Sequence, residues 1–277
     1  MAESIQRYNT DNLTLYMSVP SQDLSLFAKE LKKIPCNFIT DEEILSLTAE
    51  AYGPIPALFP SHLIQQLIKL EFWRLGKCEN YIWIDSDAYF LRPFRADDFF
   101  DAQGRLMTIT HHADELRSFS RDFNPKIAEN LDKMLLKFKP LFKCNPNNQY
   151  FGDPPLLWSC KVLENLNTDY LSTANKTIYK LLYDYPCEMQ LYGEYLLFSR
   201  VIDFIPHPPI FKIFHYAEQF FESQRMGESE YSLSKKYFGV VMQSNWTDLQ
   251  EKKKNDLMRV KRFLNREKNK ILRLIKF

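Results

Sequence analysis

Apolar and polar residues recur along this chain in patterns that predict a series of short strands and helices. Residues 13–19 alternate between the two kinds, which predicts a half-buried strand. Pro20 opens a helix with apolar residues at helical spacing. A second short strand is expected over residues 36–39, and Asp41 is expected to cap a helix that runs to Ala49.

The strongest helical pattern covers residues 61–77. Its apolar stripe is formed by Leu63, Leu67 and Leu70. The opposite side of the same helix carries Gln65, Gln66 and Lys69. Such a polar face is usually solvated, and the alternative is that it meets a ligand. Both interpretations stay open on the pattern alone.

The rest of the chain continues the alternation of strands and helices. Strands are expected over residues 81–84, 105–110 and 201–205, and helices over 125–138, 159–166 and 187–199. Strands that alternate with helices favour an α/β domain with a mainly parallel central sheet flanked by helices.

Composition places the chain among globular proteins and argues against nucleic-acid binding. It has 277 residues, 45% hydrophobic, 15% aromatic and 26% charged, with a formal net charge of +1. Residues 251–277 hold eleven Lys or Arg against three Asp or Glu, so this segment carries +8 and residues 1–250 carry −7. We therefore divide the chain into a domain over 1–250 and a basic C-terminal helix over 251–277.

Two carboxylates follow an apolar strand in the stretch NYIWIDSDAYFLRPF. Asp85 and Asp87 stand at the carboxyl end of the predicted strand 81–84, where α/β sheets bind their ligands. In an extended chain their side chains would point the same way, with the backbones roughly 6.6 Å apart. Such a pair can share one Mg²⁺ or Mn²⁺ ion, or one carboxylate can hold the ion while the other accepts a hydrogen bond from a sugar hydroxyl. The alternative is that the two residues only end the strand and turn the chain.

Five sequence blocks resemble a GT-A-type glycosyltransferase, and more narrowly a group of bacterial glycosyltransferase-like proteins known mostly as a domain of unassigned function. In order they are SIQRYNTDNLTLYMSVPSQDLSLF, LIQQLIKL, YIWIDSDAYFLRPF, PPLLWSCKVLENL and EMQLYGEYLLF, and they span about residues 4–200. The resemblance implies a GT-A-like, Rossmann-like sheet and a nucleotide-diphospho-sugar donor whose diphosphate is bridged by Mn²⁺ or Mg²⁺.

The resemblance also implies roles for individual residues at the donor site. Asp87 would bind the metal directly, and Asp85 would contact the ribose or a metal-bound water. His215 is the first candidate for a further metal ligand, and His207 the second. Lys69 and a glutamine, Gln65 or Gln66, would meet the phosphates or the sugar.

A GT-A domain opens with a strand and a base-binding loop ahead of its first helix. Here residues 4–8 resemble the end of that helix, yet Met1 lies only three residues earlier. We therefore expect the first strand and its loop to be missing, which would leave a central strand with one neighbour fewer.

Transfer with inversion needs a carboxylate that takes a proton from the acceptor hydroxyl. Glu188 is the first candidate for this catalytic base, followed by Asp184 and Glu194. Trp158 is a candidate for stacking against an acceptor sugar, although burial in the core is the more common position of a tryptophan. The sequence does not distinguish an inverting from a retaining reaction.

The predicted function is therefore metal-dependent transfer of a sugar to a glycan or lipid-linked acceptor, in bacterial surface polysaccharide synthesis. One alternative is a non-catalytic, glycosyltransferase-like remnant that acts as a binding module, and another is a haloacid-dehalogenase-like phosphatase. Residues 251–277 combine apolar residues at helical spacing with basic ones, so they either contact a membrane surface or pack on the domain. A cytoplasmic protein, peripheral at the inner face of the cell membrane, is the expected location.

Overall fold

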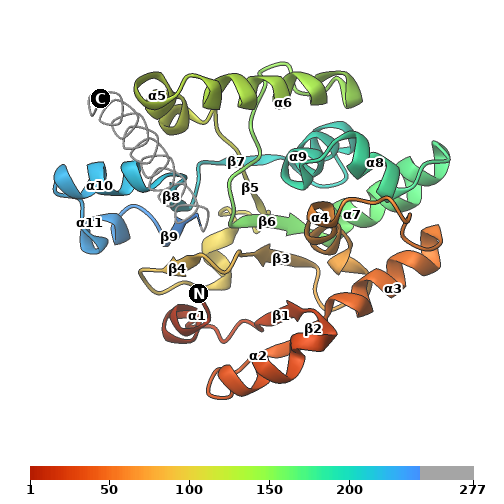
Figure 1. Ribbon diagram of the computed structural model, residues 1–277, viewed down its shortest axis with the longest axis horizontal. Helices are drawn as coiled ribbons and strands as arrows, with labels where there is room; N and C mark the ends of the chain where they lie inside the picture. Colours follow the sequence, from red (N-terminus) through yellow and green to blue (C-terminus); the bar gives the residue numbers. More distant parts are fainter. Residues whose placement is uncertain (244–277) are drawn as a thin grey trace, which may run out of the picture.

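Strands run through the middle of the molecule and helices surround them in the computed structural model, which describes residues 1–243 (Figure 1). The strands are β1 (Tyr16–Val19), β2 (Asn37–Thr40), β3 (Asn80–Trp83), β4 (Ala88–Phe90), β5 (Met107–Ile109), β6 (Leu156–Ser159), β7 (Ile205–His207), β8 (Phe211–Phe214) and β9 (Gly239–Met242). The α-helices are α1 (Ala2–Tyr8), α2 (Leu24–Glu30), α3 (Asp41–Tyr52), α4 (Ser61–Glu71), α5 (Asp114–Phe123), α6 (Lys126–Phe142), α7 (Cys160–Asn165), α8 (Ile178–Asp184), α9 (Glu188–Ser199), α10 (Ala217–Arg225) and α11 (Glu230–Ser234). Shorter helical turns are η1 (Ser21–Asp23), η2 (Phe72–Leu75), η3 (Ala96–Phe99) and the π-helical η4 (Leu166–Leu171).

The strands form several small sheets that mix parallel and antiparallel pairs. The pairs β1–β2, β5–β7 and β8–β9 are parallel, whereas β3–β6 and β4–β9 are antiparallel. Within residues 1–243, β1 pairs with β2 alone and β3 with β6 alone, so each has one edge without a strand partner. The expected α/β class is therefore confirmed, but the mainly parallel central sheet is not, because the described strands form separate small sheets that include antiparallel pairs.

Most predicted elements are present, with corrections at their ends. Asp41 was expected to cap its helix, but Thr40 does so by accepting a hydrogen bond from the Glu43 amide at 3.2 Å, and Asp41 is the first helical residue. The strand predicted over 201–205 is wrong for most of its length. Helix α9 ends at Ser199, Arg200 follows in a left-handed conformation (φ 50°), and the strand begins only at Ile205.

The core lies between α4, the β3–β6 pair and α9. The predicted stripe of α4 is confirmed, because Leu63, Leu67 and Leu70 are all buried. Trp158 of β6 is 1% exposed and stacks on Tyr192 of α9, with ring centroids 5.0 Å apart. It cannot meet a sugar there, so its prediction as an acceptor platform was wrong. Trp158 is buried because it is a large apolar side chain on a strand whose residues are all buried.

Close packing also explains a glycine in α9. A Cβ atom at Gly193 would lie 2.0 Å from Cγ of the Phe151 ring, so only glycine fits at this position. Phe151 belongs to the segment that leads into β6. The helix that carries Glu188 and the segment that carries Asp153 are thereby locked together.

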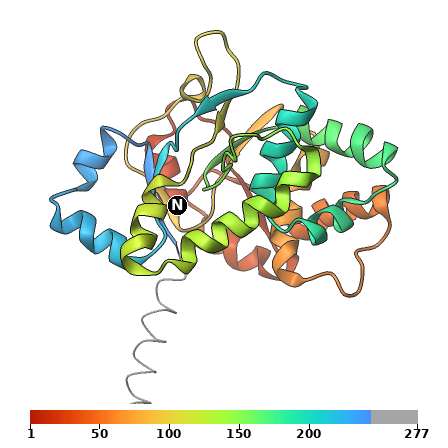
Figure 2. The same ribbon diagram turned by 90° about the horizontal axis from the view of Figure 1, so that it is seen from above.

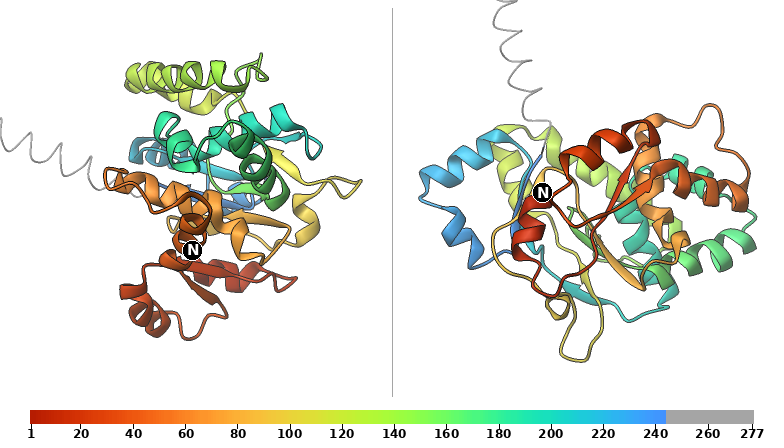
Figure 3. Two further views of the ribbon diagram at one scale, coloured as in Figure 1. Left: turned by 90° about the vertical axis from the view of Figure 1, so that its right-hand side faces the viewer. Right: turned by 90° about the horizontal axis from the view of Figure 1, so that it is seen from below.

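The helices gather in groups around the strands. Helices α10 and α11 project at one end, opposite the group formed by α3, α7 and α8 (Figure 2). Helices α5 and α6 lie beyond the strands on one side, and the β1–β2 pair with α2 lies on the other (Figure 3). Within the described residues, no helix is both long and apolar enough to cross a membrane. The predicted basic helix over 251–277 lies outside the described residues.

Candidate functional site

The two carboxylates of the DSD stretch lie on a tight turn. The amide of Ala88 donates to the carbonyl of Asp85 at 3.1 Å, and the amide of Met242 in β9 donates to the carbonyl of Asp87 at 2.9 Å. The chain therefore makes a tight turn between β3 and β4, and the extended spacing expected for Asp85 and Asp87 was wrong. The turn still places both residues at the end of β3, fixed by the neighbouring strand β9.

Lys69 of α4 reaches this turn and joins it to α9. Its Nζ lies 2.9 Å from Oδ1 of Asp85 and 3.5 Å from Oε1 of Glu188, and 3.8 Å from the centre of the Trp83 ring. The Trp83 ring shields one side of the ammonium group, so it is held by two carboxylates and a ring face. We call Lys69, Asp85 and Glu188 the Lys69 cluster. Lys69 and Asp85 come from neighbouring segments of the chain, whereas Glu188 lies 119 positions after Lys69.

Burial sets the electrostatics of the Lys69 cluster. Glu188 is 5% exposed, and burial raises the pKa of its carboxyl group, while the positive charge of Lys69 works in the opposite direction. Glu188 also stands at the first residue of α9, where the helix dipole favours a negative charge. One cation thus balances two carboxylates, and the buried one is shifted toward the neutral form. A raised pKa is the direction of shift that suits a carboxyl group for proton transfer in catalysis.

A second buried group lies beside the Lys69 cluster. Asp153 accepts a hydrogen bond from the Tyr150 hydroxyl at 2.9 Å, and its other oxygen lies 3.3 Å from Nε2 of His215. Burial alone would raise the pKa of Asp153, but His215 and the hydrogen bond from Tyr150 outweigh it, so the pKa lies below its ordinary value. We call Asp153, Tyr150 and His215 the Asp153 cluster. It holds a buried, ionised carboxylate.

The two clusters are electrostatically linked. Burial is the main cause of the raised pKa of Tyr150, and the charges of Asp153 and Glu188 both add to it. His111 closes the Asp153 cluster on one side. It accepts from the amide of Ala113 through Nδ1, so Nε2 carries the proton and donates to the carbonyl of Gly152 at 2.6 Å. Burial lowers the pKa of His111, which favours this neutral form.

His215 lies at the same end of the β4–β9–β8 sheet as Asp87, but the two side chains do not form a metal cluster. His215 directly follows β8, and Asp87 directly precedes β4. Strand β9 lies between these two strands, and the amide of Gln243 after β9 donates to the carbonyl of Phe214. Two strand spacings, about 10 Å, therefore separate His215 from Asp87. Within residues 1–243, no three His, Cys, Asp or Glu side chains come together as a preformed metal site. The expectation that His215 completes a metal shell is corrected, since its ring faces Asp153.

His207 lies elsewhere. It is in β7, and Nδ1 contacts the carbonyl of Pro208 at 2.7 Å. This contact engages one of the two ring nitrogens and does not decide whether His207 binds a metal ion, so that role stays a prediction.

Two of the predicted catalytic carboxylates are not at the site. Glu194 is buried and accepts hydrogen bonds from Asn145 at 2.8 Å and from Gln190 at 2.9 Å. It thus holds the loop before β6 in place instead of facing an acceptor. Asp184 lies on the surface and pairs with Lys180 at 2.6 Å, one helical turn away. Glu188 is the only one of the three predicted bases that joins the Lys69 cluster.

The glutamines of α4 differ in exposure. Gln65 is exposed, whereas the side-chain oxygen of Gln66 is buried and makes no hydrogen bond among the described residues. A buried oxygen of this kind normally has a donor partner, so Gln66 is the better placed of the two to accept from a ligand. The interpretation that the polar side of α4 is merely solvated is wrong for Lys69.

Asp153 and Tyr150 were not predicted as site residues. The available signal was an acidic residue next to a glycine, directly before two prolines and a strand. That signal is weak, because it does not indicate that His215, more than 60 positions later, pairs with the carboxylate.

The comparisons with known proteins identify a family and no close relative. The chain matches the model of DUF6492, described as a family of unknown function, over residues 1–248. The chain therefore belongs to this family. No curated protein and no solved structure matches it.

Proposed function

We propose that this member of the DUF6492 family is a glycosyltransferase that moves a sugar from a nucleotide-diphospho-sugar to a glycan or lipid-linked acceptor, in the synthesis of bacterial surface polysaccharide. The observation that carries the proposal is the Lys69 cluster. Three chemically suited side chains, from α4, the end of β3 and the start of α9, converge at a strand end beside a buried, ionised aspartate. Strand ends of this kind are where α/β folds bind ligands.

Donor binding would use the carboxylates of the turn and the ammonium group of Lys69. Asp87 and Asp85 would hold Mn²⁺ or Mg²⁺, and the donor diphosphate would complete the shell, since such ions commonly bind one or two carboxylates plus phosphate oxygens. The carboxylates present fit this role, although Lys69 already pairs with Asp85. The ion would supply positive charge to the departing nucleoside diphosphate. Lys69 would add a second positive charge.

Glu188 is the best-placed group to accept a proton from the acceptor hydroxyl. Its raised pKa brings the carboxyl group closer to the operating pH, which suits general-base catalysis. Asp153, paired with His215, would remain charged beside this group. The mixed α/β fold is compatible with a GT-A-like arrangement, which remains part of the proposal.

Calorimetry with UDP and GDP, with and without Mn²⁺, tests the proposal. Because the described residues offer no preformed three-residue metal site, we expect weak binding of Mn²⁺ alone and saturable nucleotide binding that requires the ion. Asp87→Ala should weaken nucleotide binding at least tenfold. Asp132→Asn is the matched control, since Asp132 is an exposed carboxylate paired with Arg117 at 2.6 Å.

A panel of nucleotide-sugar donors scored for hydrolysis then identifies the sugar. Metal-dependent binding with donor hydrolysis supports the transferase. Absence of nucleotide binding would favour the non-catalytic remnant. Hydrolysis of a generic phosphate ester, abolished by Asp85→Asn, would instead favour the phosphatase.

A further inference from the structure

A cavity of about 500 Å³ lies between α1, β4 and α11, outside both clusters described above. Its volume is within the range of small-molecule sites. The side chains that matter for recognition are Glu3, Arg7, Tyr8, Tyr89, Glu230 and Tyr231. They combine three aromatic rings with two carboxylates and one guanidinium group.

The cavity is held in shape by contacts between its three walls. The hydroxyl of Tyr89 in β4 donates to Oε1 of Glu230 in α11 at 2.9 Å, which orients the carboxylate. The amide of Phe90 donates to the hydroxyl of Ser4 in α1 at 3.0 Å. These bonds join segments more than 80 positions apart in the sequence, so the lining groups have fixed places.

An exposed aromatic ring stands at the cavity. Tyr231 is 72% exposed, and Nζ of Lys235 lies 4.3 Å from the centre of its ring. On the other wall, the guanidinium of Arg7 lies 5.1 Å from the centre of the Tyr8 ring. Large exposed rings beside hydrogen-bonding groups are typical of recognition surfaces.

The cavity also adjoins the turn of the proposed donor site. Tyr89 is two residues after Asp87, a backbone distance of about 7 Å along an extended strand. A ligand in the cavity would therefore lie near the sugar of a donor held at Asp87.

We propose that this cavity binds the acceptor saccharide, as a neutral, hydroxyl-rich sugar. The flat, apolar rings of Tyr8 and Tyr231 suit the apolar face of a pyranose. Carboxylates accept hydrogen bonds from hydroxyl groups, and Arg7 donates them. Glu3 and Glu230 balance the positive charges of Arg7 and of Lys235 beside the Tyr231 ring, so the cavity has no excess positive charge that would favour an anionic ligand such as a phosphate. The acceptor role rests on the proposed transferase function, but the sugar-binding role does not.

The test uses the full chain and free sugars, without nucleotide or metal. Saturation-transfer NMR with glucose, galactose, N-acetylglucosamine and lactose should detect binding of at least one sugar. Tyr231→Ala should weaken it at least tenfold, and so should Glu230→Ala. Tyr183→Ala is the matched control, because Tyr183 is also exposed (57%) and also has a lysine, Lys180, near its ring at 5.9 Å.

The outcomes separate this proposal from the transferase proposal. Sugar binding that depends on Tyr231 supports the cavity site even if nucleotides fail to bind. No binding of any sugar in the panel, equal binding by the Tyr231→Ala and Tyr183→Ala variants, or binding of choline in place of sugars would each overturn it. Manganese-dependent nucleotide binding should be unchanged in Tyr231→Ala, because that ring is not part of the donor site.

Discussion

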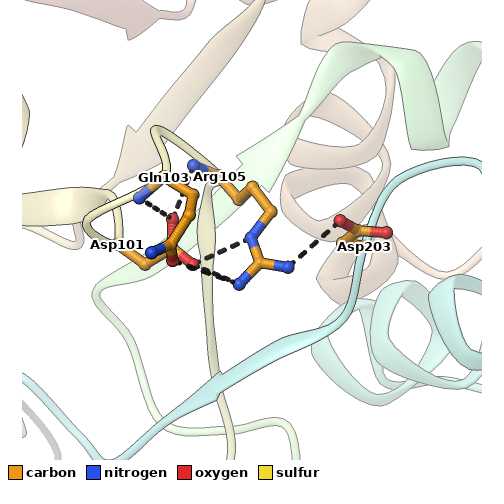
Figure 4. Close-up of polar contacts among 4 residues, drawn as sticks. All are labelled: Asp101, Gln103, Arg105 and Asp203. Carbon is orange, nitrogen blue, oxygen red and sulfur yellow. Dashed lines mark hydrogen bonds and ion pairs between the residues drawn. The ribbon is translucent and has the colours of Figure 1, made fainter.

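Two groups in this protein share one arrangement, a cation between two carboxylates. They differ in burial, in the direction of their pKa shifts and in their expected effect on stability. In the Lys69 cluster, Nζ lies 2.9 Å from Asp85 and 3.5 Å from Glu188. In the second group, Arg105 lies 2.6 Å from Asp101 and 3.4 Å from Asp203 (Figure 4). We call the second group the Arg105 cluster. The distances are nearly the same, so distance alone does not separate a site from a surface contact.

The two clusters differ in how deeply their carboxylates are buried and in whether their members come from one local turn. Asp101 closes a local turn, because it accepts hydrogen bonds from the amides of Gln103 and Arg105 as well as from the Arg105 side chain (Figure 4). These hydrogen bonds lower the pKa of Asp101. Burial instead raises the pKa of Glu188, which has one cation and little water to stabilise its charge. The Arg105 cluster stabilises a turn, whereas burial in the Lys69 cluster raises the pKa of a carboxyl group.

The largest expected difference between the clusters comes from a pair of glycines. Gly193 supports the helix of Glu188, and a Cβ there would lie 2.0 Å from the Phe151 ring, so Gly193→Ala should lower the free energy of unfolding by about 3 kcal/mol. Gly104 lies in the turn of the Arg105 cluster with open space around it and φ of 72°, so Gly104→Ala should cost about 1 kcal/mol from backbone strain. Urea denaturation measures both. Equal losses would contradict the close packing at α9.

Removing the cation of each cluster should give the next largest difference in the free energy of unfolding. Lys69→Met leaves a buried carboxylate without its partner, and we expect a loss of about 2 kcal/mol, less than for a fully buried pair because Asp85 is partly exposed. Arg105→Met breaks a solvent-exposed ion pair and should lower the free energy of unfolding much less. Urea denaturation of the two variants side by side measures this. A greater loss of stability in Arg105→Met would contradict the view that Lys69, and not Arg105, neutralises a buried carboxylate.

The pH dependence of stability should have opposite signs in the two clusters. The pKa of Glu188 is raised above its ordinary value of 4.5, so the folded state binds the proton more tightly than the unfolded state. Its contribution to stability therefore falls as the pH rises from 4.5 through the folded-state pKa. Glu188→Gln should remove this loss. Denaturation midpoints from pH 4 to 8 test it, and an unchanged slope in the variant would contradict the raised pKa.

Asp101 should give the smallest and opposite effect. Its pKa is lowered from the ordinary value of 3.8, so its contribution is present above that pH and is lost as the pH falls through the folded-state pKa. Asp101→Asn should flatten the acid side of the stability profile between about pH 4 and pH 2. It should leave the profile above pH 5 unchanged. A change near neutral pH would mean that the turn is coupled to the buried site.

The sequence by itself determined the local elements. Helical spacing identified the buried stripe of α4. The position of Asp85 and Asp87 at a strand end was also readable, because an apolar run stops there. The strands β4, β8 and β9 were not predicted, since runs of three or four apolar residues look the same in a strand, a helix or a loop.

Only the tertiary structure decided which polar residues form the site. Glu188 and Glu194 lie on the same helix six residues apart, yet one faces Lys69 and the other fixes a loop through Asn145. Periodicity predicts that a face is buried but not what covers it, because the partner comes from a distant segment. For the same reason the sequence could not show that Asp153 pairs with His215, or that Trp83 covers Lys69.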